Sequence, residues 1–261
     1  MKDKWNNAEL YESYVGRWSR LLAFEFLKWI DSDKGLVWID VGCGTGALTS
    51  AILNTQAPHK VIGIDSSDEH VQFLHEKIND PRAEFHTGDA VKLPVADESA
   101  DVIVSGLVLN FIGDISTALN EFKRAARSGA LISGYVWDYA GKMEFMRYFW
   151  DAAVSLSDDA IELDEGNRFK ICNPDLLHEL FALAGLKSVE VTYMDIPTVF
   201  KDFEDYWTPF LSGIGPAPGY CMSLTEENRN KLKEKIYESL PKEIDGSIKL
   251  IARAIAVKAV K

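Results

Sequence analysis

The sequence predicts an α/β protein built on a doubly wound, mostly parallel sheet of seven strands. Apolar runs suited to buried strands alternate along the chain with segments of helical period, which is the pattern of crossover connections. A strand that runs into alternate glycines, "IDVGCGTGALTS", adds a loop typical of the carboxyl edge of such sheets. The expected strands are Leu36 to Val41, Lys60 to Ile64, Ala83 to Thr87, Asp101 to Ser105, Ala130 to Val136, Val189 to Asp195 and Ile248 to Val257.

Helix signals fall between the expected strands. Apolar residues recur at helical spacing across residues 71–78 and 115–126. Ser66-Ser67-Asp68-Glu69 has the form of a capping box. Asn173-Pro174, followed by Gly185, supplies a cap, a first-turn proline and a terminating glycine. These two helices have the best-defined predicted boundaries.

Composition narrows the class of protein and its partners. The chain has 261 residues, which suits one large domain, and a formal net charge of -12. Such an acidic chain lacks the basic surface of a nucleic-acid binder and favours small, neutral or cationic partners. The three cysteines, at 43, 172 and 221, form no disulfide framework or zinc pair, so we expect no metal. The polar N-terminus has no signal-peptide or membrane-span pattern, so we expect a cytoplasmic protein.

Three segments interrupt the alternation of strands and helices. They cover approximately residues 1–31, 138–173 and 198–224, and all three are rich in aromatic side chains. Long connections in a compact domain are usually functional or disordered, and aromatic content argues against disorder. We expect a single domain, 1–261, in which these segments form a lid over the carboxyl edge of the sheet. Additional core packing is the alternative.

The glycine loop alone does not identify its ligand. Gly42, Gly44 and Gly46 would let a ligand approach the main chain. With Ala47 in the third position, the loop also satisfies the dinucleotide pattern G-x-G-x-x-G/A, whose ribose-binding acid would be Asp65. No G-K-[ST] follows, which excludes a Walker P-loop. A carboxylate just before the first glycine suits an ammonium or sulfonium better than a pyrophosphate.

Acidic or glycine-bearing turns follow each of four consecutive expected strands. Asp40 and the glycine loop end the first strand, and Asp65 ends the second. Gly88-Asp89-Ala90 follows the third, and "SGLVLNFIGD" the fourth. Because parallel strands end at the same edge, these turns are expected to converge on one ligand.

These blocks together resemble class I S-adenosylmethionine-dependent methyltransferases, particularly their small-molecule branch similar to ubiquinone-biosynthesis enzymes. "WIDVGCGTG", "VIGIDSS", "HTGDAVKLPV" and "ADVIVSGLVLNFI" are similar to the family's first four motifs and cover about Leu36 to Gly134. The resemblance implies a Rossmann-like methyltransferase fold whose last strand is antiparallel. It also implies transfer of a methyl group from S-adenosylmethionine to a small organic acceptor, leaving S-adenosylhomocysteine.

The resemblance also implies roles for individual residues. Asp65 would accept hydrogen bonds from the ribose hydroxyls, and Asp89 would receive the adenine amine. From their chemistry, the N-terminal aromatic and basic residues would help hold the sulfonium or a carboxylate. The expected cofactor-binding set is Tyr14, Arg17, Asp40, Gly42, Cys43, Gly44, Asp65, Ser66, Asp89, Ala90, Gly106 and Leu107.

The acceptor site is the least defined part of the prediction. Asn110-Phe111 stands where related enzymes often carry a histidine, so no general base is assigned. The expected substrate-contacting residues are Tyr11, Trp18, Asn110, Trp137, Asp138 and Trp207. Two alternative functions stay open at this point: an NAD(P)-dependent oxidoreductase and a non-catalytic S-adenosylmethionine-binding regulator.

Overall fold

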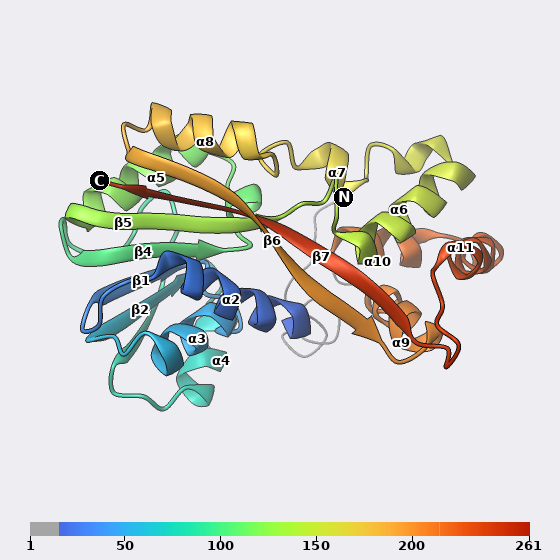
Figure 1. The fold of residues 1–261 in the computed structure, drawn as a ribbon, viewed down its shortest axis with the longest axis horizontal. Helices are drawn as coiled ribbons and strands as arrows, with labels where there is room; N and C mark the ends of the chain where they lie inside the picture. The colour runs from blue at the N-terminus through green and yellow to red at the C-terminus, as the bar shows by residue number, and fades with distance from the viewer. Residues whose placement is uncertain (1–15, 214) are drawn as a thin grey trace. The chain divides into compact units, whose positions relative to one another are not determined.

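A computed structural model describes residues 16–213 and 215–261 (Figure 1). These residues form two compact units. The first contains residues 137–170 and 195–253 together with the described start of the chain up to Trp18. The second contains residues 19–136, 171–194 and 254–261. The division falls inside three long strands, so each unit holds part of them.

The strands form one seven-stranded sheet in the order β3-β2-β1-β4-β5-β7-β6. Pairing is parallel from β3 through β2, β1 and β4 to β5. The order reverses direction at β1, which creates a switch point between β1 and β4. The strand bounds are β1 Val37–Val41, β2 Lys60–Asp65, β3 Ala83–Thr87, β4 Ala100–Gly106, β5 Ala126–Trp137, β6 Lys187–Phe200 and β7 Ile248–Val260.

The last strand, β7, is antiparallel to β5, as the family resemblance implies. The Lys261 N–H donates to the Ala130 carbonyl at 3.0 Å, and the Ser133 hydroxyl donates to the Val257 carbonyl at 2.7 Å. Residue numbers therefore rise along β5 as they fall along β7. This arrangement confirms the predicted fold class, a mostly parallel doubly wound sheet.

All seven predicted strands exist, but β6 is longer than predicted. The prediction ended at Asp195, before Pro197. In the structure Met194, Ile196, Thr198 and Phe200 continue the buried positions of an alternating strand. Proline is tolerated there because β6 is the last strand of the sheet, where an N–H is not needed for pairing on one side.

The second unit places its helices between the strands. Its α4 begins one residue later than the capping box indicates: the hydroxyl of Ser67, not Ser66, accepts the His70 N–H. In α8 the Asn173 side chain caps the helix, and Gly185 follows with a positive φ, as predicted. The helices are α2 Arg17–Ile30, α3 Ala47–Thr55, α4 Asp68–Lys77, η2 Leu109–Phe111, α5 Ile115–Ala125 and α8 Pro174–Leu183, with the first two residues of α2 in the first unit.

The first unit is a helical body with an aromatic core. Phe149 and Phe210 stack at 4.4 Å between ring centroids, and the buried Tyr206 hydroxyl donates to the Phe145 carbonyl at 2.7 Å. Such packed rings stabilise the unit through apolar burial and ring geometry. Its helices are α6 Glu144–Leu156, η3 Asp158–Ala160, α7 Glu165–Arg168, α9 Phe203–Trp207, η4 Thr208–Ser212, α10 Pro216–Ser223 and α11 Glu226–Ser239.

Candidate functional site

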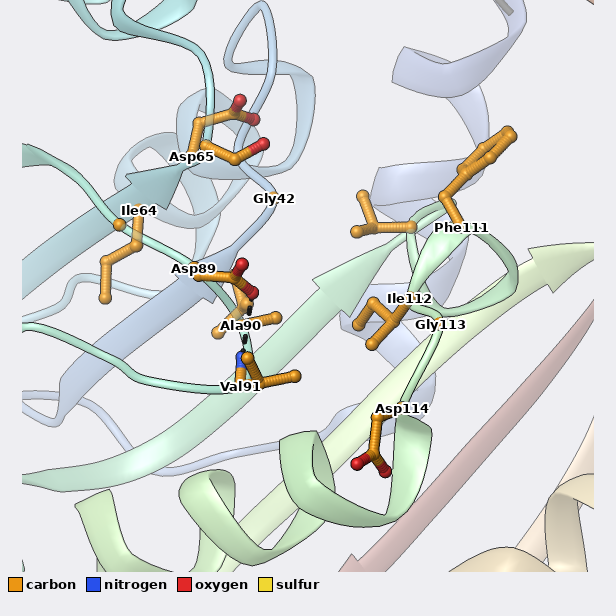
Figure 2. Close-up of a pocket in the computed structure, with 14 residues that line it drawn as sticks. Gly42, Ile64, Asp65, Asp89, Ala90, Val91, Phe111, Ile112, Gly113 and Asp114 are labelled. Atoms are coloured by element: carbon orange, nitrogen blue, oxygen red, sulfur yellow. Dashed lines mark hydrogen bonds between the residues drawn. The ribbon is translucent and has the colours of Figure 1, made fainter. Parts of the chain in front are cut away.

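A pocket of about 460 Å³ lies in the second unit where β1 to β4 end. Figure 2 shows Asp65 and Asp89 on one side of the pocket and Phe111 and Ile112 on the other. Its size suits a small ligand or part of a cofactor. The lining residues are Val41, Gly42, Ile64, Asp65, Ser66, Gly88, Asp89, Ala90, Val91, Val108, Phe111, Ile112, Gly113 and Asp114.

The glycine loop is fixed against the end of β2. The N–H groups of Gly42 and Cys43 both donate to the Ile64 carbonyl, at 2.7 and 3.1 Å. Gly42 has a φ of 75°, and a Cβ there would lie 2.4 Å from the Val108 side chain. Glycine is therefore required at this position both by the backbone conformation and by the close approach of the segment after β4.

Cys43 presents its backbone, and not its thiol, to the loop surface. Its side chain is buried in a cluster with Val71, Leu74 and Phe85. Burial raises the pKa of the Cys43 thiol, and the nearby charges of Asp40 and Asp65 raise it further. The thiol is consequently a neutral packing group.

Asp65 ends β2 and already accepts several hydrogen bonds. Its Oδ1 accepts the Ser67 N–H at 2.9 Å and lies 3.3 Å from His70 Nδ1, while its Oδ2 accepts the Gly44 N–H at 2.9 Å. Burial acts to raise the pKa of Asp65, but the hydrogen bonds from His70, Ser67 and Gly44 outweigh it and lower that pKa. Asp65 is therefore a fixed carboxylate, with an acceptor direction left on Oδ2.

The turn after β3 carries an accessible acid, Asp89. Its Oδ1 accepts the Val91 N–H at 3.1 Å, which holds the carboxylate against its own turn (Figure 2). The residue is exposed and lines the pocket. Its carboxylate is consequently available to an amine donor in the pocket.

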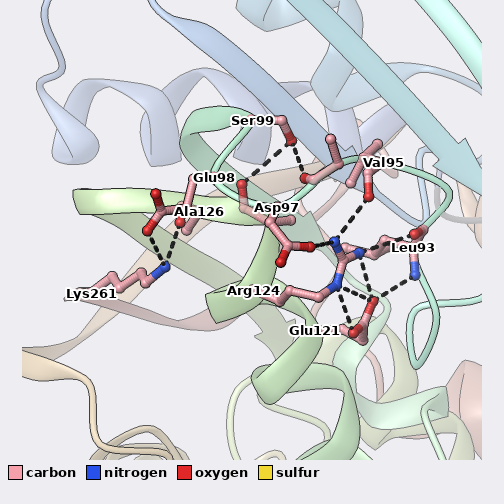
Figure 3. A network of polar contacts seen from close by, with 11 residues as sticks. Leu93, Val95, Asp97, Glu98, Ser99, Glu121, Arg124, Ala126 and Lys261 are labelled. Carbon is pink, nitrogen blue, oxygen red and sulfur yellow. Dashed lines mark hydrogen bonds and ion pairs between the residues drawn. The ribbon is translucent and has the colours of Figure 1, made fainter.

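Arg124 of α5 holds the segment that follows this turn (Figure 3). Its guanidinium donates to the Leu93 and Val95 carbonyls at 3.2 and 3.0 Å and pairs with Glu121. Glu121 in turn accepts the Leu93 N–H at 3.0 Å. The guanidinium and carboxylate therefore join the chain beyond Asp89 to α5.

The segment after β4 forms the opposite wall of the pocket. Leu107 has a φ of 63°, uncommon for a residue with a side chain, and its N–H donates to the Tyr135 carbonyl at 2.8 Å. Gly106, Leu107 and Asn110 are not among the lining residues, so their expected contacts stay predictions.

Sequence reasoning missed most of this opposite wall. Its lining residues Val108, Phe111, Ile112, Gly113 and Asp114 all belong to the quoted turn "SGLVLNFIGD" or follow it directly. The available signal was the apolar character of a turn that carries on past the end of a strand. Phe111 is 41% exposed, which is high for a large apolar side chain.

Asp40 lies beneath the loop and not on the pocket wall. It is 0% exposed, and its Oδ2 accepts the Thr49 hydroxyl at 2.6 Å. Its Oδ1 has no hydrogen-bond partner among the described residues. Burial raises the pKa of Asp40 to about 7; the Thr49 hydroxyl opposes this shift, and the negative charge of Asp65 adds to it. The direct contact with an ammonium that the sequence suggests stays a prediction.

Five further predicted residues lie outside the pocket unit or outside the described residues. Trp137 and Trp207 are buried in the first unit. The Asp138 carboxylate accepts the N–H groups of Gly141 and Lys142 in the turn that follows it, at 3.0 and 3.1 Å, and it does not cap α6, whose N-cap is Met143. Tyr11 and Tyr14 lie outside the described residues.

Arg17 and Trp18 lie in the first unit as a packed pair. The Arg17 guanidinium lies 4.4 Å from the Trp18 ring and 4.8 Å from the Phe200 ring, and it pairs with Asp205 at 3.1 Å. Its Nε and Nη2 have no hydrogen-bond partner in the described parts of the chain. The expected carboxylate partner is thus present, but it comes from the protein itself.

The described residues contain neither a metal-binding cluster nor a membrane-spanning helix. Within residues 16–213 and 215–261, no group of three or more His, Cys, Asp or Glu side chains is placed to hold a metal ion. No helix in those ranges has the length and apolar character needed to cross a membrane.

The chain segment that forms this pocket matches a known protein family. The Methyltransferase domain family matches residues 39–133. Demethylmenaquinone methyltransferase of Roseiflexus sp. is 38% identical over 95 residues, which cover 36% of this chain and 40% of that protein. Demethylmenaquinone methyltransferase of Staphylococcus carnosus is 28% identical over 201 residues, covering 72% of this chain and 81% of that one.

A solved methyltransferase structure has a similar fold over nearly the whole chain. Phosphoethanolamine N-methyltransferase 2 of Haemonchus contortus, in complex with S-adenosyl-L-methionine, has a TM-score of 0.60 at 16% identity and covers 97% of this chain and 56% of that one. The chain is thus similar to S-adenosylmethionine-dependent methyltransferases over residues 39–133, and its fold is the Rossmann-like fold of such enzymes. This similarity argues against the oxidoreductase alternative that the glycine pattern left open.

Proposed function

We propose that this protein transfers a methyl group from S-adenosylmethionine to a small organic acceptor. The observation that carries the proposal is the convergence of four strand ends on one pocket. Gly42, Asp65, Asp89 and Val108 come from the turns after β1, β2, β3 and β4, and all four line it. The aligned segment spans only 40% of the Roseiflexus relative, so the acceptor of that protein is not transferred to this chain.

The polar groups of the pocket fit the adenosyl part of the cofactor. Asp65 has an acceptor direction left on Oδ2 for a ribose hydroxyl, and Asp89 offers an exposed carboxylate to the adenine amine. Ser66 and the Ala90 backbone line the same cavity, beside the expected position of the adenine ring. These groups lie at the ends of β2 and β3, so the glycine loop after β1 is left for the methionine part of the cofactor.

The methionine end would lie along the backbone of Gly42, Cys43 and Gly44. The absence of a Cβ at Gly42 and the inward-pointing thiol of Cys43 leave main-chain atoms at this surface. Gly106 and Leu107 would face the reacting methyl group, a placement inferred from the family motifs. Tyr14 and Arg17 are further candidates for cofactor contact, proposed from their side-chain chemistry alone.

The residues of this chain would catalyse the reaction mainly by positioning. The bound cofactor supplies an already electrophilic methyl group, so the acceptor has to be held in line with the S–CH3 bond while water is excluded. Asp65 and the loop fix the adenosyl end through the Ser67 and Gly44 hydrogen bonds described above. A general base is needed only if the acceptor must lose a proton to become nucleophilic, and no residue is assigned to that role.

The acceptor surface would come from the segments expected to form a lid. Their aromatic side chains would supply apolar walls for a small organic molecule. Tyr11, Trp18, Asn110, Trp137, Asp138 and Trp207 are the candidates. The acidic composition supports an acceptor other than nucleic acid. The proposed location, the cytoplasm, rests on the sequence pattern of the N-terminus alone.

Calorimetric titration with S-adenosylmethionine, S-adenosylhomocysteine and NAD tests the cofactor. We expect binding of the first two, and Asp65→Ala should weaken it roughly 10- to 100-fold. Asp33→Ala is the matched control, since Asp33 is exposed in the loop before β1. Binding of NAD alone would overturn the proposal.

Turnover separates an enzyme from a regulator that only binds the cofactor. Small-molecule acceptors are incubated with the protein and S-adenosylmethionine, and release of S-adenosylhomocysteine is measured. We expect at least one acceptor to give release that Asp65→Ala diminishes. Tight cofactor binding without release on any acceptor would favour the non-catalytic regulator.

A further inference from the structure

Asp40 is a buried acid with one carboxylate oxygen unsatisfied. It sits one residue before the end of β1, 0% exposed, beneath the glycine loop. The Thr49 hydroxyl of α3 donates to Oδ2 at 2.6 Å, while Oδ1 has no partner among the described residues. An ionised carboxylate in this position would be desolvated with only part of its acceptor capacity used, which is costly.

Among the described residues, no cationic side chain acts on the Asp40 carboxylate. On the neighbouring strands Asp40 is opposite Gly63 of β2 and Val104 of β4, which are uncharged. The charged group that acts on it is Asp65, whose negative charge opposes ionisation, and the Cys43 thiol nearby is neutral. Only the start of α3, through Thr49, favours the anion.

We propose that Asp40 carries a proton in the cofactor-free protein and releases it when a cationic cofactor binds over the glycine loop. The inference rests on the proposed function and adds a proton to its binding equilibrium. S-adenosylmethionine carries a sulfonium, an ammonium and a carboxylate, a net charge of one positive. The carboxylic acid ionises, the proton goes to solvent, and the buried carboxylate then faces a cation across the loop.

The number of protons released depends on pH in a defined way. Burial raises the pKa of Asp40 to about 7 in the free protein. Binding should therefore release about 0.9 proton at pH 6, about half a proton at pH 7 and about 0.1 at pH 8. Because the proton competes with the cation, affinity for S-adenosylmethionine should fall about tenfold between pH 8 and pH 6.

The test is calorimetric titration of the full chain at one pH in buffers of different ionisation enthalpy. The slope of the observed enthalpy against the buffer enthalpy gives the protons released. Asp40→Asn removes the ionisable group at nearly constant shape, and Asp33→Asn is the exposed control. Comparing variants with the same ligand cancels any titration of the ligand's own amine.

Two further arms assign the proton to Asp40. 5′-Methylthioadenosine contains the adenosine but lacks the ammonium and sulfonium, so it should bind without release. His70→Asn removes a titratable side chain that contacts Asp65, and proton release should persist in this variant. Thr49→Val removes the hydroxyl that favours the ionised form of Asp40, so proton release on binding should extend to higher pH. This variant tests the inference independently if Asp40→Asn does not fold.

The outcomes separate this inference from the proposed function. Release in the wild type that disappears in Asp40→Asn and persists in Asp33→Asn supports it. S-adenosylmethionine binding with no release near pH 6 overturns the Asp40 inference and leaves the methyltransferase proposal intact. Release that is lost in His70→Asn assigns the proton to the His70–Asp65 pair and also overturns it. Failure of the wild type to bind S-adenosylmethionine at all contradicts the proposed function itself.

Discussion

Raising the pH should destabilise the cofactor-free protein through Asp40. Burial raises the pKa of this acid from 3.8 to about 7 in the folded protein. Between these two values the folded state binds a proton that the unfolded state has lost, so stability falls as pH rises. Three pKa units at about 1.36 kcal/mol each give a total of about 4 kcal/mol. More than half of it, roughly 2 to 3 kcal/mol, falls between pH 5 and pH 8.

Urea unfolding followed by circular dichroism at pH 5 and pH 8 measures this loss. Asp40→Asn cannot ionise, so its free energy of unfolding should lack that decline, and the variant should gain on the wild type as the pH rises. Other titrating groups affect both proteins equally, which makes the difference between them the relevant quantity. An identical pH dependence in wild type and Asp40→Asn would show that the acid is not protonated in the folded state.

Three other substitutions test how the pocket is held together. Asp65→Asn should weaken S-adenosylmethionine binding roughly 10- to 100-fold in calorimetry with unchanged circular dichroism; wild-type affinity would remove Asp65 from the site. Gly42→Ala should cost about 2 kcal/mol or more of unfolding free energy, because φ is 75° and the Cβ meets Val108 at 2.4 Å. Adding Val108→Ala should recover part of that loss, and no recovery would contradict the steric explanation. Arg124→Met should lower stability by roughly 1–3 kcal/mol and speed proteolysis at residues 93–98, since it removes donors to two carbonyls there. Unchanged proteolysis would show that other contacts hold this segment.

Much of the strand pattern was readable from the sequence because central strands such as β1 and β4 are largely buried apolar runs. All seven were expected, and the parallel order follows from their helical connections. The extension of β6 beyond Asp195 was not expected. It contains Pro197, which a strand accepts only at a position such as the edge of the sheet, where β6 lies. The division into two units depends on how distant segments pack, and local periodicity carries no information on that.

The candidate site was predictable where the ligand contact depends on backbone or on acids at strand ends. Gly42 of the glycine loop and the turns with Asp65 and Asp89 line one pocket, while Gly44 and Cys43 are not among its lining residues, and all contacts with a cofactor stay predictions. Phe111 and Ile112 were missed because the only signal they gave, apolar side chains in a turn, does not distinguish a pocket wall from core packing. Residues of the first unit, such as Trp207, were selected by composition, which does not distinguish a core aromatic from a substrate wall.

Strand register explains why two acids of one motif set behave so differently. Asp40 pairs with Gly63, and Val41 pairs with Ile64, so Asp65 lies two rows further toward the carboxyl edge than Asp40. Two rows are about 6.6 Å along a strand. That distance separates an acid at the pocket, held ionised by hydrogen bonds, from a buried acid whose pKa is raised. The number of residues between each acid and the end of its strand therefore predicts its role. Asp65, the last residue of β2, is expected to contact the ligand, and Asp40, one residue before the end of β1, is expected to change its protonation when a cation binds.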